Sequence, residues 1–461
     1  MSVDAPRVMV AGTASGCGKT TVACGLMRAL ARRGLRVAAC KCGPDYLDPL
    51  FHERVLGTPS RNLDLFLGNE RLVCGLVARG AQHADITVVE GVMGYYDGIA
   101  TSVDASSYDV ARVTGTPTVL VVDARGRALS VAAEVLGFVR MCEPSQVAGV
   151  ILNRVFESYA MRLREAVEAH AGVPVLGYVP PIEEAHLASR HLGLVSADEV
   201  PRLQQKVDAV ASTLERTVDL DAVLALARTA EPLDEPDAME PEAHDMRPTI
   251  AVARDEAFSF YYADTLELFE RLGARLAYFS PVRDACLPQG TCGLYLGGGY
   301  PELHARELSR NEAMRAAVRD AVRAGMPTIA ECGGFLYLHE FLEDDRATAW
   351  PMVGVVLGRG FGTGRLGRFG YVTLTAKRDG LLARAGEELR AHEFHYWDSD
   401  TPGDAFVARK PQSDRSWDCV VSSPALHADF PHLYLVGAPK VARHFVEACA
   451  AFGVGKGMIE R

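Results

Sequence analysis

A cysteine at a predicted strand-to-helix turn is the first candidate for chemistry in this sequence. An apolar, β-prone run from Pro327 to Ala330 leads into Glu331-Cys332-Gly333-Gly334, and helix-forming residues follow. A sharp turn of this kind presents a side chain at the carboxyl edge of a sheet. It also directs the first free N–H groups of the helix towards that side chain, which favours a thiolate and can stabilise an oxyanion. Cys332 is therefore a candidate nucleophile, although most free cysteines are small buried core residues.

Two other segments could complete a site around this cysteine. A strand-like run leads into three successive glycines, and the N–H groups of Gly298 and Gly299, with that of Gly333, are candidates for an oxyanion hole that also contacts glutamine. Far downstream, His432 is the candidate general base. A cysteine followed by a distant histidine is the order expected when both converge on one site of an α/β fold.

A phosphate-binding loop is predicted near the N-terminus. A strand-like run, residues 7–12, is followed by Thr13-Ala-Ser-Gly-Cys-Gly-Lys-Thr-Thr21 and then by a helical pattern. The Gly-Lys-Thr end of the loop is present, although Thr13 stands where the usual pattern has its first glycine. Backbone N–H groups and the lysine of such a loop bind phosphate oxygens, and the threonine can ligate Mg²⁺. The residues predicted to bind ATP are Gly16, Gly18, Lys19, Thr20 and Thr21.

Polar side chains that follow other predicted strands could serve the same site. Asp45 and Asp48 lie in a Gly/Pro loop after the second strand, where metal or substrate binding and ordinary turn chemistry are both adequate explanations. Glu90 ends an apolar strand, where the second metal-orienting carboxylate of a P-loop protein belongs. Asn153 either reads a nucleobase edge or only forms a turn, and Arg190 either faces an acidic substrate or is solvated.

The strands expected to position these residues alternate with helical stretches, which predicts an α/β fold with a parallel sheet and ligands at the carboxyl ends of its strands. In the first half the expected strands are residues 7–12, 37–41, 86–90, 118–123, 147–153 and 173–178. An acidic, proline-rich stretch without periodicity, residues 229–248, is expected to be a linker. A second α/β unit is expected after it, with strands at 249–254, 275–280 and 293–297 and helices near 258–272 and 308–324.

Composition limits the class of protein. A chain of 461 residues with 48% hydrophobic and 23% charged residues predicts two or three globular domains. No apolar run is long enough to cross a bilayer and the N-terminus has no signal pattern, so we expect a cytoplasmic protein that does not bind membranes. The eleven cysteines include no Cys-x-x-Cys pair and are expected to be reduced. A net charge of −11 argues against nucleic acid as a partner.

A nucleotide site and a Cys/His site in one chain suggest a reaction that needs both. Attack of a thiolate on the side-chain amide of glutamine releases ammonia. ATP with Mg²⁺ can activate a carboxylate as an acyl phosphate, which ammonia then displaces. The combination predicts a glutamine-dependent amide ligase.

The sequence resembles the cobyrinate a,c-diamide synthases over essentially its whole length. The stretches that carry the resemblance in the first half are residues 15–20, 41–49, 62–64, 90–98 and 189–193. In the second half they are residues 253–258, 297–302, 331–334 and 392–395. The block Gly43-Pro-Asp-Tyr-Leu-Asp-Pro49 is highly specific, whereas the P-loop and Cys-Gly-Gly occur in many families.

The resemblance implies a dethiobiotin-synthetase-like ligase domain at residues 1–228 and a class I type glutaminase domain at residues 249–461. It implies ATP-dependent amidation of the a and c carboxylates of cobyrinate in cobalamin biosynthesis, with ammonia passed internally between the sites. Cys332 would be the nucleophile and His432 its activator. The residues implied for Mg²⁺ are Thr20, Asp45 and Glu90, and those for substrate and activation are Asp45, Tyr46, Asp48, Asp97 and Arg190.

One feature departs from the class I glutaminase pattern, a second histidine is a possible base, and two other functions remain open. Tyr434 stands two places after His432, where class I glutaminases usually have an acid. His444 is a rival base, although the helical pattern around it favours a helix surface. The substrate could instead be hydrogenobyrinate or nickel-sirohydrochlorin. A P-loop ATPase switch that binds a partner is the alternative of another class, and the intact Cys332 and triple glycine argue against it.

Overall fold

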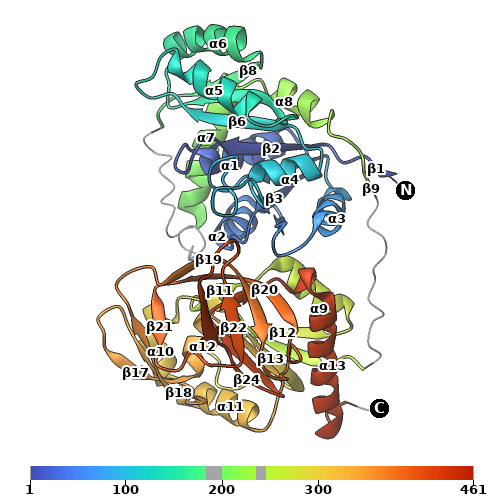
Figure 1. The fold of residues 1–461 in the computed structure, drawn as a ribbon, viewed down its shortest axis with the longest axis vertical. Helices are drawn as coiled ribbons and strands as arrows, with labels where there is room; N and C mark the ends of the chain where they lie inside the picture. Colours follow the sequence, from blue (N-terminus) through green and yellow to red (C-terminus); the bar gives the residue numbers. More distant parts are fainter. Residues whose placement is uncertain (1, 183–199, 235–245, 460–461) are drawn as a thin grey trace. The chain divides into compact units, whose positions relative to one another are not determined.

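The computed structural model describes residues 2–182, 200–234 and 246–459 (Figure 1). The chain divides into two units, Met1–Ala238 and Met239–Arg461. The dividing point lies within the stretch 229–248 that was expected to be a linker, of which residues 235–245 are outside the described part. Leu233–Asp234 form a short strand, β9, that pairs with β1 (Ser2–Val3). This end of the expected linker therefore belongs to the fold of unit 1.

A seven-stranded sheet forms the centre of unit 1, with the strand order β4-β3-β5-β2-β6-β7-β8. Every neighbouring pair in it runs parallel, as predicted. Most of its strands are short and largely apolar because both faces of a parallel sheet are covered. Their bounds are β2 (Arg7–Gly12), β3 (Val37–Cys42), β4 (Ser60–Leu63), β5 (Ile86–Glu90), β6 (Thr118–Asp123), β7 (Val147–Asn153) and β8 (Val175–Val179). Only β4 was not predicted.

Helix α1 (Lys19–Arg32) begins directly after the P-loop and anchors it to the core of unit 1. Its apolar positions Val22, Leu26 and Leu30 are buried and pack with residues of the sheet and of α7 and α8 in one cluster. The other helices of unit 1 are α2 (Leu47–Phe51), a π-helical turn η1 (His52–Leu56), α3 (Glu70–Ala81), α4 (Ser107–Val113), α5 (Ser130–Arg140), α6 (Glu157–Ala171), α7 (Val200–Thr217) and α8 (Leu220–Ala227).

Unit 2 is built on a six-stranded sheet with the order β12-β10-β13-β15-β25-β24. Its first five strands are parallel and β24 runs antiparallel to β25. The bounds are β10 (Thr249–Ala253), β12 (Arg275–Phe279), β13 (Thr291–Leu296), β15 (Thr328–Glu331), β24 (Val421–Ser423) and β25 (Leu426–Asp429). The helices are α9 (Ala263–Arg271), α10 (Ala305–Arg310), α11 (Glu312–Arg323), α12 (Gly333–Leu338) and α13 (Pro439–Gly455), with 3₁₀ turns η3 (Pro301–His304) and η4 (Leu435–Gly437).

Three smaller sheets complete unit 2, and none of them was predicted from the sequence. A two-stranded sheet pairs β11 (Phe258–Phe260) with β14 (Gly298–Gly299). A four-stranded sheet has the order β17-β16-β18-β21, and an antiparallel five-stranded sheet has the order β23-β22-β19-β20-β26. Their bounds are β16 (His339–Glu343), β17 (Ala349–Pro351), β18 (Val356–Gly362), β19 (Arg368–Ala376), β20 (Glu388–His395), β21 (Trp397–Ser399), β22 (Phe406–Arg409), β23 (Ser416–Cys419) and β26 (His432–Leu433).

Two of the predicted helices were wrong in extent. The helix expected near 258–272 begins only at Ala263, because residues 258–260 pair with the glycine strand β14 instead. The helix expected near 308–324 is two helices, since Asn311 ends α10 and its side-chain oxygen caps α11 by accepting a hydrogen bond from the N–H of Met314 at 3.3 Å. In the described residues no helix has the length and apolar character that crossing a bilayer requires.

Candidate active sites

The P-loop of unit 1 connects β2 to α1 and has the backbone that its glycines permit. Gly16 and Gly18 have φ angles of 79° and 98°, in the left-handed region that favours glycine. A Cβ atom on Gly18 would lie 2.2 Å from Nδ2 of Asn153, so this position has no room for a side chain. Lys19, Thr20 and Thr21 form the first turn of α1, where N–H groups and the helix dipole favour an anion.

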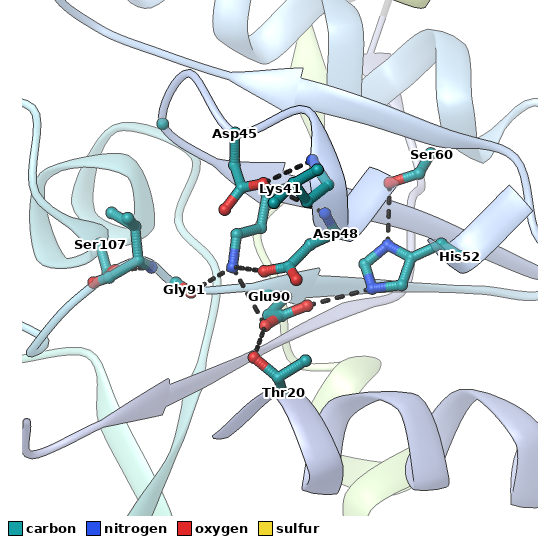
Figure 2. A network of polar contacts seen from close by, with 12 residues as sticks. Thr20, Lys41, Asp45, Asp48, His52, Ser60, Glu90, Gly91 and Ser107 are labelled. Atoms are coloured by element: carbon teal, nitrogen blue, oxygen red, sulfur yellow. Dashed lines mark hydrogen bonds and ion pairs between the residues drawn. The ribbon is translucent and has the colours of Figure 1, made fainter. Parts of the chain in front are cut away.

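Figure 2 shows a buried polar network centred on Glu90 at the carboxyl end of β5. Thr20 Oγ1 donates to Glu90 Oε1 at 2.6 Å, and Lys41 Nζ lies 3.0 Å from the same oxygen. The other oxygen, Oε2, lies 3.0 Å from His52 Nε2, and His52 Nδ1 lies 3.1 Å from Ser60 Oγ. Burial alone would raise the pKa of Glu90, but Lys41, His52 and Thr20 hold it below its ordinary value. Glu90 is therefore a buried carboxylate that remains ionised.

The two predicted aspartates are close to this network but have different surroundings. Asp45 Oδ1 accepts hydrogen bonds from the N–H groups of Leu47 and Asp48, at 2.8 and 3.1 Å, and so supports the start of α2. Asp48 Oδ2 lies 2.5 Å from Lys41 Nζ. Burial raises the pKa of Asp48 to about 7, with further contributions from the negative charges of Asp45 and Glu90. Asp48 can therefore change its protonation state near neutral pH.

The residues predicted to ligate Mg²⁺ fit such an ion. Mg²⁺ in phosphoryl-transfer sites is usually held by one or two carboxylates together with substrate phosphates and water. Thr20, Asp45 and Glu90 offer one hydroxyl and two carboxyl groups. With Asp48 there are three acids around a single lysine, Lys41. No cluster of three or more His, Cys, Asp or Glu side chains able to hold a metal by itself occurs in the described residues. A metal here would also need the phosphates of a nucleotide.

The remaining predicted residues of unit 1 have varied positions. Asn153 donates from Nδ2 to the carbonyl of Cys17 at 2.7 Å, so its amide braces the P-loop. Asp97 is exposed and accepts a hydrogen bond from the N–H of the buried Gly94 at 2.9 Å. Tyr46 is largely buried at the start of α2. Arg190 lies outside the described residues.

In unit 2, Cys332 stands at the turn between β15 and α12, as the sequence predicted. Its φ and ψ angles of 47° and −102° are unusual for a residue with a side chain. Its N–H donates to the carbonyl of Asp429 on the neighbouring strand at 2.7 Å, which holds the turn in place. Strained backbone of this kind is concentrated at active sites.

His432 is the partner of Cys332. It forms the short strand β26 with Leu433, which pairs with β20, and its ring is 2% exposed. Burial alone would lower the pKa of His432, but its interactions with Cys332 and Glu331 outweigh this effect and raise it to about 10. A histidine of this pKa is protonated at neutral pH, so it can act as the general acid of an acyl transfer.

The predicted oxyanion-hole glycines meet at the same place. A Cβ atom on Gly298 would lie 2.4 Å from His432 Cε1, and one on Gly333 would lie 3.0 Å from the backbone nitrogen of Gly299. The triple-glycine segment therefore contacts both the histidine ring and the turn that carries Cys332. Glycines are needed here because any side chain would separate these elements.

Three buried residues of these sites were missed by the sequence reasoning: Lys41, His52 and Glu331. Lys41 could have been noticed as a lone cation within an apolar strand, and Glu331 as an acid beside the nucleophile. His52 carries no comparable local signal. The rival base His444 is exposed on α13, as the helical pattern favoured.

Comparison with known proteins identifies relatives for both units. Residues 8–195 match the family described as the CobQ/CobB/MinD/ParA nucleotide binding domain. Residues 249–428 match the family described as the CobB/CobQ-like glutamine amidotransferase domain.

Several curated proteins are similar to nearly the entire chain. A protein of Caldanaerobacter subterraneus is 38% identical over 96% of this chain and 98% of its own length. One of Salmonella typhimurium is 40% identical over 95% of this chain and 97% of its own. One of Thermoplasma acidophilum is 38% identical over 96% of this chain and 99% of its own. Each of these relatives is named cobyrinate a,c-diamide synthase.

Proposed function

Because the chain belongs to the cobyrinate a,c-diamide synthase family, we propose that it converts the a and c carboxylates of cobyrinate to amides. ATP activates each carboxylate, and the side chain of glutamine supplies the nitrogen. The observation that carries this proposal is the presence in one chain of a buried Cys332–His432 pair and of a P-loop whose Thr20 is hydrogen-bonded to Glu90. A glutaminase alone would not need the second feature, and an ATPase alone would not need the first.

In unit 2 the reaction begins with attack of the Cys332 thiolate on the amide carbon of glutamine. The negative charge that develops on the amide oxygen is stabilised by the N–H groups of Gly298, Gly299 and Gly333. Protonated His432 gives its proton to the nitrogen, which leaves as ammonia, and a glutamyl thioester remains on Cys332. Water, deprotonated by His432, then hydrolyses the thioester to glutamate and restores the thiolate–imidazolium pair.

In unit 1 an oxygen of a cobyrinate carboxylate attacks the γ-phosphorus of ATP, and ADP leaves. Ammonia attacks the resulting acyl phosphate, and phosphate leaves as the amide forms. The phosphates of ATP are bound by Gly16, Gly18, Lys19, Thr20 and Thr21, with Asn153 near the same loop. Thr20, Asp45 and Glu90 would hold Mg²⁺, which supplies positive charge to the transferred phosphoryl group when it is bound.

The substrate carboxylate is assigned to the polar residues at α2, to Asp97 and to Arg190. These are Asp45, Tyr46, Asp48, Asp97 and Arg190. The support for this assignment is the convergence of Asp45 and Asp48 on the Lys41–Glu90 pair. We assign the ligase reaction to residues 1–228 and the glutaminase reaction to residues 249–461, and we expect the enzyme to act in the cytoplasm on small-molecule substrates.

Two variants test the division of labour between the units. Cys332→Ser is expected to lose amidation with glutamine but to retain amidation with high ammonium. Lys19→Ala is expected to lose amidation with either nitrogen source because it acts on ATP. The assay incubates each protein with ATP, Mg²⁺ and cobyrinate, and mass spectrometry measures the conversion of carboxyl groups to amides. Loss of ammonium-driven amidation in a folded Cys332→Ser variant would refute the proposal.

A further inference from the structure

The glutaminase site lacks an acid at the usual place for orienting the histidine. Tyr434, two residues after His432, occupies that place. Its ring is 2% exposed and packs edge-on against Tyr262, with ring centres 4.8 Å apart and an interplanar angle of 80°. Tyr434 is thus a packing residue of unit 2. A cysteine–histidine pair nevertheless needs a group that fixes the tautomer and direction of the imidazole.

Glu331, the residue immediately before the nucleophile, lies where such a group is needed. Its side chain is 1% exposed at the end of β15, and Oε2 lies 3.7 Å from Nδ1 of His432. Each carboxylate oxygen also accepts a hydrogen bond from a fixed donor. The N–H of Leu433 donates to Oε1 at 3.0 Å, and the hydroxyl of Tyr295 donates to Oε2 at 3.1 Å. The carboxylate is therefore held in one orientation beside the ring.

Two buried acids close to Glu331, namely Asp429 and Glu393, face other histidines. Asp429 is 1% exposed and lies 3.5 Å from His427. Glu393 is fully buried, with Oε1 2.9 Å from Nε2 of His395. The register of the sheet places Glu331 near His432. Glu331 on β15 is paired with Asp429 on β25, and His432 follows Asp429 by three residues. Of these three acids, Glu331 is the one that faces His432.

We propose that Glu331 is the positioning residue of the glutaminase site. Its carboxylate accepts the Nδ1–H of His432, so that Nε2 faces Cys332 and the imidazolium formed during catalysis is stabilised. The role that class I glutaminases give to an acid two places after the histidine is thus taken by the residue before the cysteine. The inference rests on the proposed roles of Cys332 and His432. The distance of 3.7 Å is expected to shorten when glutamine binds, as catalytic hydrogen bonds often do.

The two donors around Glu331 make one substitution especially informative. In Glu331→Gln, the N–H of Leu433 requires an acceptor, so the amide oxygen takes the place of Oε1 and the NH₂ group takes the place of Oε2. That NH₂ group would face Nδ1 of His432, which must then act as an acceptor, and the ring proton moves to Nε2. A neutral imidazole with a proton on Nε2 cannot accept the proton of Cys332. An inverted tautomer lowers turnover by about 10⁴-fold in a comparable catalytic triad.

Three variants separate this role from a purely structural one. Glu331→Gln keeps the size and the hydrogen bond to Leu433, whereas Glu331→Ala leaves a cavity, so the alanine variant is expected to be the less stable of the two. The tautomer argument predicts the opposite order for glutamine-driven activity, with Glu331→Gln the less active. Glu393→Gln is the control, since it changes an equally buried carboxylate that faces His395. It is expected to keep glutamine-driven activity within about threefold.

Two measurements are made on each full-length variant. The first compares amidation driven by glutamine with amidation driven by ammonium, and the expected result for Glu331→Gln is a loss of at least about 100-fold with glutamine alone. The second follows alkylation of Cys332 by iodoacetamide across pH, read by peptide mass spectrometry against the exposed Cys286 in the same sample. The Cys332 rate at neutral pH should fall at least tenfold and its inflection should move to higher pH. Labelling of the buried Cys449 reports any unfolding.

The outcomes are distinguishable from failure of the proposed function. If the unmodified chain shows no glutamine-driven activity, the roles of Cys332 and His432 are wrong. If the unmodified chain is active and Glu331→Gln retains its activity and its alkylation profile, only the role of Glu331 is wrong. A parallel loss with glutamine and ammonium, or greater activity in Glu331→Gln than in Glu331→Ala, would equally overturn it.

Discussion

Replacement of Lys41 by methionine tests whether this buried cation stabilises the ionised carboxylates around it in unit 1. The ammonium group is 2% exposed and lies 2.5 Å from Asp48 Oδ2 and 3.0 Å from Glu90 Oε1 (Figure 2). It also donates to the carbonyl of Gly91 at 3.1 Å. Methionine has a similar length and no charge, so Lys41→Met removes the cation with little change in volume.

The expected cost is that of leaving buried carboxylates without their counterion. Removal of one partner of a buried ion pair typically destabilises a protein by about 3–5 kcal/mol. His52 and Thr20 still contact Glu90 in the variant, so Glu90 keeps part of its stabilisation. Asp48 loses its cation, and the negative charges of Asp45 and Glu90 remain nearby. Asp48 is therefore expected to take up a proton.

This protonation makes the effect of Lys41→Met depend on pH. The folded pKa of Asp48, about 7, already lies above the unfolded value of about 3.9. The proton on Asp48 therefore adds to the free energy of unfolding in full below about pH 4, and this contribution is lost as the pH rises through 7. Removal of the ammonium group raises the folded pKa further, so that above pH 7 the variant holds about one more proton than the unmodified chain. The destabilisation is expected to grow by up to about 1.4 kcal/mol per pH unit above pH 7 and to be constant below about pH 6.

The positions of the tryptophans allow this loss to be assigned to unit 1. Trp350, Trp397 and Trp417 are the three tryptophans of the chain and all belong to unit 2. In urea titrations at pH 6 and pH 8.5, far-UV circular dichroism follows both units, whereas tryptophan fluorescence follows unit 2. Lys41→Met should shift the circular dichroism transition, more at pH 8.5, and leave the fluorescence transition nearly unchanged.

A second substitution provides the control. In Lys41→Met with Asp48→Asn, the uncompensated carboxylate is absent, so part of the stability should return and the dependence on pH should vanish. Equal destabilisation by Lys41→Met at both pH values, or a double variant no more stable than the single one, would refute the reasoning.

Two further outcomes test the separation of the sites. Gly298→Ala places a Cβ atom 2.4 Å from His432 Cε1, and a displacement of about 1 Å at a catalytic group can cost about 10²-fold. Glutamine-driven amidation should fall by about that factor, and ammonium-driven amidation should persist. The control Gly455→Ala, at a position on α13 with open space around it, should change neither. An equal loss with both nitrogen sources in Gly298→Ala would contradict this reasoning. Chelation of Mg²⁺ by EDTA should end amidation with either nitrogen source and leave glutamine hydrolysis measurable as released glutamate. Amidation that continues in EDTA would exclude the metal assigned to Thr20, Asp45 and Glu90.

The sequence predicts the parallel sheets well because their signal is local. The runs Arg7–Gly12 and Ile86–Glu90 are mostly apolar and buried throughout, and each ends at a polar or glycine residue where a ligand-binding edge begins. The edge strand of the five-stranded sheet of unit 2 was not predicted because its pairing is not local. This strand, β26, is two residues long and exists through pairing with β20, some 40 residues earlier in the chain. Periodicity cannot reveal a strand so short.

The same distinction explains which site residues were found. Cys332, Lys19 and Glu90 stand within motifs whose chemistry can be read from adjacent residues. The role of Lys41 depends on strand register, because Lys41 on β3 lies opposite Glu90 on the neighbouring strand β5.

His52 and Glu331 likewise depend on partners distant in the chain, at separations of 38 and 101 residues from Glu90 and His432. Glu331 was visible in the sequence as an acid at the end of an apolar run, whereas His52 gave no such signal, and the partner of neither residue could be identified from the sequence. A buried ionisable group must have a partner, because isolation in a protein interior costs several kcal/mol. The sequence can therefore nominate such residues, and only the fold can say which opposite group each one serves.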